Sequence, residues 1–102
     1  MVLNAQFSED GKVFTVSISG RFDITVYKDL VESYKDKLES VSKWILDMAE
    51  VEYVDSSALG MLLMMRERAG GENADITIVN LNSNLKKIFT TANFHKLFNI
   101  EE

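Results

Sequence analysis

The chain has no cysteine and no proline among its 102 residues, and it carries a single histidine, His95. Without cysteine there is neither a disulfide framework nor a thiolate metal site, which is the pattern of a cytoplasmic protein. Without proline, and without a Ser/Gly-rich or repeated segment, nothing marks a linker or an internal duplication. We therefore expect residues 1–102 to form a single domain.

Long hydrophobic runs and basic clusters are missing as well. The longest apolar run, residues 58–65, is far shorter than the roughly 20 residues that cross a bilayer. The N-terminus lacks the basic start and apolar core of a secretory signal. The formal net charge of -5 and the pI near 4.8 produce a field that repels phosphate backbones and anionic lipid surfaces. We expect no nucleic-acid partner and no membrane insertion, which leaves a protein partner or a small ligand.

The first half of the chain predicts an opening hairpin followed by a helix and a strand. Residues 2–7 and 12–19 have the composition and alternation of strands, and the turn SEDG joins them. Apolar residues spaced by three and four from Asp23 to Leu38 predict an amphipathic helix, with Asp23 or Thr25 as its N-cap. Residues 43–49 form a short apolar run that is typical of a parallel strand covered on both faces.

The second half continues the alternation. Residues 51–70 predict a loop and then a helix that ends at a pair of glycines. Residues 74–81 predict another strand, and the segment SNLKKIFTTANF predicts a third helix, capped by Asn82 or Ser83. The tail HKLFNIEE has room only for a short last strand. The expected fold class is therefore α/β, with a mixed sheet of about four to five strands, right-handed parallel βαβ units and helices packed against the sheet.

A helical wheel divides the helix within residues 51–70 into two faces. One stripe, which should face the sheet, comprises Ala58, Met61, Leu62, Met65 and Ala69. Glu67 lies opposite this stripe and fixes the solvent side. The outward strip is unusually apolar for a solvent face, because it contains Ser56, Gly60, Leu63 and Met64.

The outward strip has two interpretations. A neighbouring helix or a second copy of the chain could cover it, since single exposed apolar residues are common. Alternatively it is a docking surface for another protein, because contiguous apolar patches rimmed by polar groups mark interaction sites and methionine adapts to binding partners.

Ser56 is the chemically informative residue of this strip. It could simply be the N-cap of the helix. At a helix start, however, backbone N–H groups and the helix dipole also stabilise a phosphate, and phosphorylation adds about -1.5 to -2 charges. Such a charge would penalise any partner that buries this surface in an apolar or acidic contact.

The segment VEYVDSSALGMLL, which follows WILDMA and precedes DITIVNLNSNLKKIFTTANF, resembles the STAS domain family, and in particular the bacterial anti-sigma factor antagonists. The segments SGRFD, at residues 19–23, and LKKIFTTANFHKLFNI strengthen the resemblance. The most specific element is the family's D-S-[ST]-G-L-G motif, which here occupies residues 55–60. Ala58 stands where the family usually has glycine.

The resemblance implies a function. In that family the serine directly after the aspartate is phosphorylated by a partner that is both anti-sigma factor and serine kinase, and the phosphorylated domain releases that partner. It implies Ser56 as the acceptor, ATP bound by the partner kinase, no cofactor in this chain, a phosphoserine phosphatase as second partner, and a monomer or weak dimer. Together with the outward strip, the expected contact residues are Asp23, Asp55, Ser56, Ser57, Leu59, Gly60, Leu63 and Met64.

Enzymatic and metal chemistry receive little support. A serine nucleophile needs a base, and His95 offers the only imidazole, while the nucleophile-elbow pattern is absent. The carboxylates between Asp47 and Asp55 lack a known metal-loop spacing and predict a solvated loop. We therefore expect a protein without catalysis. The alternatives are a non-switching STAS subunit of a signalling assembly or lipid-transport complex, and a small-molecule binder or weak enzyme.

Overall fold

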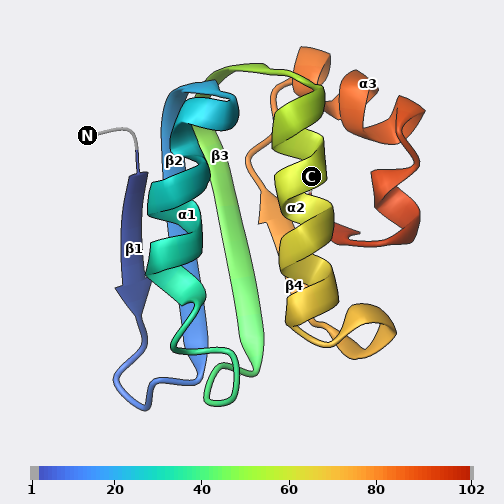
Figure 1. Ribbon diagram of the computed structural model, residues 1–102. Coiled ribbons are helices and arrows are strands. Elements are labelled where there is room, and N and C mark those ends of the chain that lie inside the picture. Colours follow the sequence, from blue (N-terminus) through green and yellow to red (C-terminus); the bar gives the residue numbers. More distant parts are fainter. Residues whose placement is uncertain (1–2, 102) are drawn as a thin grey trace.

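The computed structural model describes residues 3–101, which form one mixed sheet with helices on one of its faces (Figure 1). The sheet has the order β1-β2-β3-β4-β5. Strand β1 pairs antiparallel with β2, and all other pairs are parallel. The strands are β1 (Leu3–Phe7), β2 (Val13–Phe22), β3 (Lys43–Val54), β4 (Ile76–Val79) and β5 (Asn99–Ile100). The predicted α/β fold is confirmed, although Val2 of the first predicted strand lies outside the described residues.

The connections between the parallel strands carry the helices. They are α1 (Tyr27–Tyr34), α2 (Ser56–Arg68) and α3 (Ser83–Thr91), with the short 3-10 helices η1 (Ile24–Val26), η2 (Gly71–Asn73) and η3 (Phe94–Lys96). In Figure 1, α1 and α2 stand in front of the sheet, with α1 over β2 and α2 beside α1, and α3 lies on the far side of α2 from α1. The carboxyl ends of the parallel strands and the N-terminus of α2 therefore lie at the same end of the molecule.

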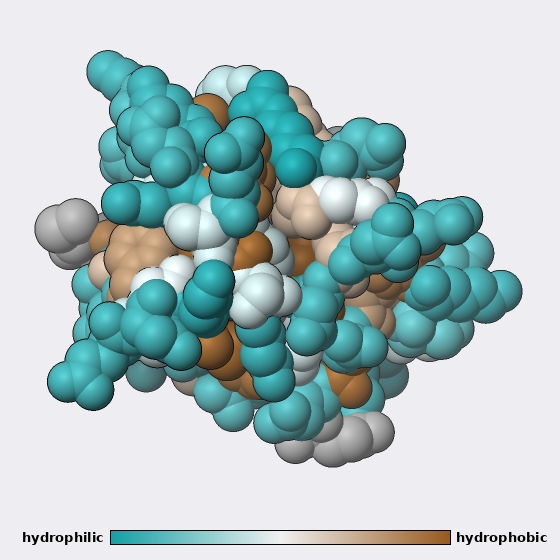
Figure 2. All heavy atoms as spheres, turned by 90° about the horizontal axis from the view of Figure 1, so that it is seen from below, coloured by the Kyte–Doolittle hydropathy of each residue, from teal (hydrophilic) through white to brown (hydrophobic). Residues whose placement is uncertain are grey.

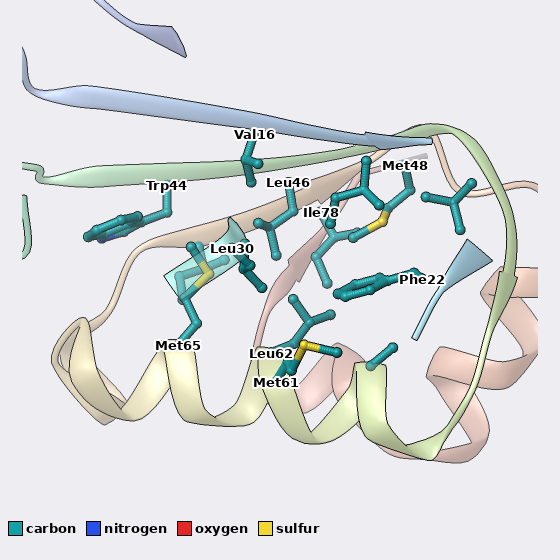
Figure 3. Packing of buried hydrophobic residues seen from close by; sticks show 14 of the residues in the cluster. Val16, Phe22, Leu30, Trp44, Leu46, Met48, Met61, Leu62, Met65 and Ile78 are labelled. Atoms are coloured by element: carbon teal, nitrogen blue, oxygen red, sulfur yellow. The ribbon is translucent and has the colours of Figure 1, made fainter. Parts of the chain in front are cut away.

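The hydrophobic core lies between this helical layer and one face of the sheet. In β3, Trp44, Leu46 and Met48 are fully buried, whereas Ile45 and Asp47 on the other face are only half-buried. Figure 3 shows the side chains of α2 pointing at the sheet, with Met61, Leu62 and Met65 directed toward Trp44, Leu46 and Ile78. The prediction that residues 43–49 are covered on both faces is wrong, because the described helices cover one face.

Strand β3 is also longer than predicted. It continues to Val54, so that residues 51–54 and the acidic Glu50 and Glu52 belong to a strand rather than to a solvated loop. The pairing of β2 with β3 shifts register twice before Phe22 meets Val54. These bulges break the two-residue alternation by which a strand is recognised in a sequence.

The first helix is shorter than predicted. Helix α1 ends at Tyr34, and the chain then makes tight turns in which the N–H of Lys37 donates to the carbonyl of Tyr34 at 2.9 Å. Leu38 still packs against the core from this turn region. Tyr27, which the spacing places on the apolar face of the predicted helix, is instead exposed.

The end of the molecule opposite the α2 N-terminus is mainly hydrophilic. Figure 2 views the molecule from this end, and hydrophilic residues cover most of it, with hydrophobic residues showing in the hollows between them.

Candidate functional site

Three helices begin at the carboxyl edge of the parallel strands, and each has a polar cap. The carboxylate Oδ1 of Asp23, after β2, accepts a hydrogen bond from the N–H of Thr25 at 3.0 Å. After β3, Oδ1 of Asp55 accepts from the N–H of Ala58 at 3.1 Å. After β4, Oδ1 of Asn82 accepts from the N–H of Leu85 at 2.8 Å. Because these caps satisfy the first free N–H groups, the helices start at defined residues beside one another.

The two serines that follow Asp55 differ in their hydrogen bonding. The hydroxyl of Ser57 donates to Oδ1 of Asp55 at 2.6 Å, and Ser57 is half-buried. Ser56 is the first residue of α2 and is exposed, and no residue in the described part of the chain is hydrogen-bonded to its hydroxyl. Of the adjacent pair, therefore, Ser56 presents the accessible hydroxyl.

The interpretation of Ser56 as the N-cap is corrected by this geometry. The cap is Asp55, whose backbone is extended at φ -124 and ψ -175 and whose carboxylate reaches over the first turn. Ser56 already lies inside the helix. Its hydroxyl is consequently not needed to hold the helix start.

The site carries two negative charges next to Ser56. The hydrogen bond from Ser57, followed by that from the N–H of Ala58, holds the pKa of Asp55 below its ordinary value, and the charge of Asp23 acts in the opposite direction. The pKa of Asp23 is likewise lowered, first by the hydroxyl and then by the N–H of Thr25. Both carboxylates are therefore ionised at neutral pH.

Sequence reasoning missed a group of exposed side chains next to these carboxylates. Ile24 of η1 is 63% exposed, Tyr27 is 38% exposed and Tyr53 is 42% exposed. The guanidinium of Arg21 lies 4.2 Å from the ring centroid of Tyr53, and its Nε lies 3.5 Å from Oδ2 of Asp23. Arg21 and Tyr53 come together because they are register partners on adjacent strands, and this pairing follows two register shifts that the sequence pattern does not reveal.

The two predicted faces of α2 are present. Ala58, Met61, Leu62 and Met65 are buried against the sheet, and Ala69 is half-buried. On the outward strip, Gly60 and Leu63 are exposed and Met64 is half-buried.

Leu59 belongs to a neighbouring part of the surface. It is half-buried and lines a shallow groove together with Lys87, Ile88, Thr91 and Ala92 of the α3 region. The predicted contact residues therefore fall into two parts. One is the strand-end cluster of Asp23, Asp55, Ser56 and Ser57, and the other is the α2 face.

Catalytic and metal-binding alternatives gain no support from the geometry. His95 is exposed in η3, and no hydrogen bond connects it to Ser56. Residues 3–101 contain no group of three or more His, Cys, Asp or Glu side chains placed to hold a metal ion. Within the same residues, every helix is too short or too polar to span a bilayer.

Comparisons with known proteins agree with this fold. A family model described as "Mlab, STAS domain" matches residues 5–100. The STAS-domain containing protein PA14_20770 of Pseudomonas aeruginosa (strain UCBPP-PA14) is 40% identical over 100 residues, which are 98% of this chain and 99% of that protein.

Solved structures show the same architecture at low sequence identity. The anti-sigma factor antagonist SpoIIAA in its unphosphorylated form has a TM-score of 0.77 at 12% identity, covering 98% of this chain and 87% of its own. A putative anti-sigma factor antagonist from Thermotoga maritima has a TM-score of 0.81 at 17% identity, with 98% and 86% covered. An anti-sigma factor antagonist from Mycobacterium paratuberculosis has a TM-score of 0.76 at 20% identity, with 96% and 84% covered. The chain belongs to the STAS domain family.

Proposed function

We propose that this STAS domain is a phosphorylation-switched protein-binding module of the anti-sigma factor antagonist type. It binds an anti-sigma factor with serine kinase activity while Ser56 is unmodified, and it releases this partner once Ser56 is phosphorylated. A phosphoserine phosphatase restores the binding form. The observation that carries the proposal is the difference between the two serines: Ser57 is hydrogen-bonded to Asp55, whereas Ser56 is exposed with a free hydroxyl.

The chemistry requires no catalytic group from this domain. The oxygen of the Ser56 hydroxyl attacks the γ-phosphorus of ATP held by the kinase, and the bond between that phosphorus and the departing ADP breaks as the new one forms. The hydroxyl proton passes to a base of the kinase. Accordingly, the domain contributes an accessible oxygen on a rigid helix start and binds no cofactor itself.

Charge explains how such a modification would end binding without unfolding the domain. A phosphate at the first residue of α2 is stabilised by the positive end of the helix dipole, so the helix persists. The same phosphate adds about -1.5 to -2 charges beside Asp23 and Asp55, which are already ionised. A partner surface that accommodates the unmodified site then faces three adjacent acidic groups.

The surface around Ser56 is suited to a protein partner. It combines ionised carboxylates with the exposed side chains of Ile24, Tyr27 and Tyr53, and it continues along α2 to Leu63. Aromatic side chains with a polar surround are enriched at protein interfaces. The predicted contact residues Asp23, Asp55, Ser56, Ser57, Leu59, Gly60, Leu63 and Met64 form the proposed partner-binding surface.

The test uses the intact domain as bait in extracts of its native cells. Captured partners are identified by mass spectrometry, and the affinity of the purified kinase is then measured for wild type, Ser56→Ala, Ser56→Asp and Ser57→Ala. We expect Ser56→Ala to bind like wild type and Ser56→Asp to bind at least about tenfold more weakly, about 1.4 kcal/mol. Ser57→Ala shows what the loss of a neighbouring hydroxyl, itself part of the proposed surface, does to the affinity without an added charge. Equal affinities of Ser56→Ala and Ser56→Asp would contradict the switch.

The second candidate function is a non-switching STAS subunit whose apolar surface is permanently covered, in a signalling assembly or a lipid-transport complex. The groove lined by Leu59, Ile88 and Ala92 favours it, because this apolar surface lies outside the strand-end cluster around Ser56. Recovery of one stable partner with equal yield by Ser56→Ala and Ser56→Asp, and loss of that partner with Ile88→Glu, would favour the subunit over the switch.

A further inference from the structure

The two edges of the sheet are protected to different degrees. Edge strand β5 has two residues and is followed by Glu101, so it offers little backbone for pairing. Edge strand β1 has five residues, Leu3–Phe7, and contains neither a charged residue nor a proline. Natural proteins usually protect an edge strand with charges, proline or a bulge, because an open edge pairs with further strands.

The hydrogen-bond pattern identifies which groups of β1 are open. The N–H of Ser8 donates to the carbonyl of Val13 at 2.9 Å, and this pair continues the register in which Gln6 faces Thr15. Hydrogen-bonded pairs alternate along an antiparallel ladder, so the backbone groups of Asn4 and Gln6 point toward β2. Those of Leu3, Ala5 and Phe7 therefore point away from the sheet.

We propose that β1 pairs antiparallel with β1 of a second copy of the chain, about a two-fold axis at Ala5, to form a continuous ten-stranded sheet. The sequence of β1 is complementary to itself about this residue. Leu3 lies opposite Phe7 of the second copy on the helix-covered side, and Asn4 lies opposite Gln6 of the second copy on the helix-free side. Each of the three outward-facing pairs exchanges two backbone hydrogen bonds.

The charges of the chain permit this pairing despite its acidic balance. The acidic residues nearest to β1 along the sequence are Glu9 and Asp10, in the turn beyond Phe7, and the ammonium of Lys37 lies 5.4 Å from the ring centroid of Phe7. In the two-fold arrangement the two Glu9 residues lie at opposite ends of the paired strands, about 27 Å apart at 3.4 Å per residue. This separation is several times the Debye length at physiological ionic strength, about 8 Å, so their repulsion is screened.

The proposed interface leaves the Ser56 site accessible. Strand β1 lies at one side of the sheet, and β2 and β3 separate it from α2 in Figure 1. The dimer therefore does not depend on the proposed function, and each copy presents its own α2 surface.

The test places like charges on the helix-free side of β1, where Asn4 and Gln6 are exposed and the core is not disturbed. The variants N4K/Q6K and N4E/Q6E each bring like charges face to face across the two-fold axis. In sedimentation equilibrium we expect wild type to dimerise as its concentration rises, and each variant to dimerise at least about tenfold more weakly. A 1:1 mixture of the two variants should restore the dimer as a heterodimer. The control Thr90→Lys with Thr91→Lys adds two lysines on α3 and should leave dimerisation unchanged.

A backbone variant tests the same interface independently of charge. Ala5→Pro removes an N–H that does not pair with β2, a position at which an edge strand tolerates proline. Circular dichroism should show a folded protein, and sedimentation should show a monomer. In wild type, the amides of Ala5 and Phe7 should exchange hydrogen more slowly at higher protein concentration. A wild type that stays monomeric up to about 1 mM, or a dimer that none of these variants weakens, overturns the proposal.

Discussion

At the scale of single residues, one carboxylate gives two neighbouring serines different roles. Asp55 caps α2 and at the same time holds the hydroxyl of Ser57, so that Ser56 alone remains free. The sequence motif predicts Ser56 as the acceptor by resemblance. It could not show that Asp55 rather than Ser56 is the cap, because both residue types are favoured at that position and only backbone angles distinguish them.

The first prediction concerns Asp55 and pH. Its folded-state pKa lies below the value of the unfolded chain, so its contribution to stability is fully present above the unfolded value of 3.8 and is lost as pH falls through the folded-state pKa. Asp55→Ala should therefore lower the urea midpoint at pH 7, and its difference from wild type should shrink below pH 3.8. Ser56→Ala serves as control and should show no such difference at either pH. If the urea midpoint of Asp55→Ala lies below that of wild type by the same amount at every pH, the role of the ionised cap is contradicted.

The second prediction concerns Gly60, which lies in the middle of α2. A Cβ added there meets no atom within 4 Å. Gly60→Ala should stabilise the domain by about 0.5–1 kcal/mol, because alanine loses less conformational entropy in a helix. Because Gly60 belongs to the proposed partner surface, the same variant should bind the partner more weakly. Chemical denaturation of Gly60→Ala measures its stability, and titration with the partner measures its affinity. An affinity equal to that of wild type would show that Gly60 is not part of the contact surface.

At the scale of elements, α2 was predicted well and β3 was not. Helical periodicity placed the buried and exposed residues of α2 on the correct faces, since an uninterrupted helix keeps its period. In β3 the buried residues are Trp44, Leu46 and Met48, followed by Val51 and Val54 at intervals of three. The register shifts against β2 cause this change of interval, and the two-residue period of a strand is lost there.

The third prediction compares adjacent leucines of α2. Leu62 is fully buried, whereas Leu63 is 41% exposed. Leu62→Ala should cost about 2–5 kcal/mol of unfolding free energy, because it leaves a cavity in the core. Leu63→Ala should change stability by less than about 0.5 kcal/mol while weakening partner binding. Urea denaturation of both variants is the measurement, and equal costs would contradict the assignment of the two faces.

At the scale of the whole molecule, residues 3–101 form a sheet that their α-helices cover on one face and leave open on the other. The alternation of strands and helices predicted the class and the order of elements. It did not predict the open face, because the composition of residues 43–49 alone resembles a strand that is buried on both sides. The half-buried Ile45 and Asp47 show that this strand instead has one solvent side.

The fourth prediction tests this one-sided core. Ile45→Thr keeps a β-branched residue on the helix-free face and should cost less than about 1 kcal/mol. Leu46→Ala, one residue further along β3, should cost about 2–5 kcal/mol, because Leu46 is completely buried beneath the helices. Thermal and urea unfolding of the two variants provide the comparison. A cost for Ile45→Thr as large as that for Leu46→Ala would indicate a second covered face.

The most direct test of the central claim is phosphosite mapping of the protein isolated from its native cells, by intact mass and peptide fragmentation. We expect a form heavier by one phosphate, with the phosphate on Ser56 and none on Ser57, since the hydroxyl of Ser57 is engaged by Asp55. We also expect this form to disappear in cells that carry Ser56→Ala. A phosphate on Ser57, or a protein that remains unmodified in all growth conditions, would contradict the proposed switch.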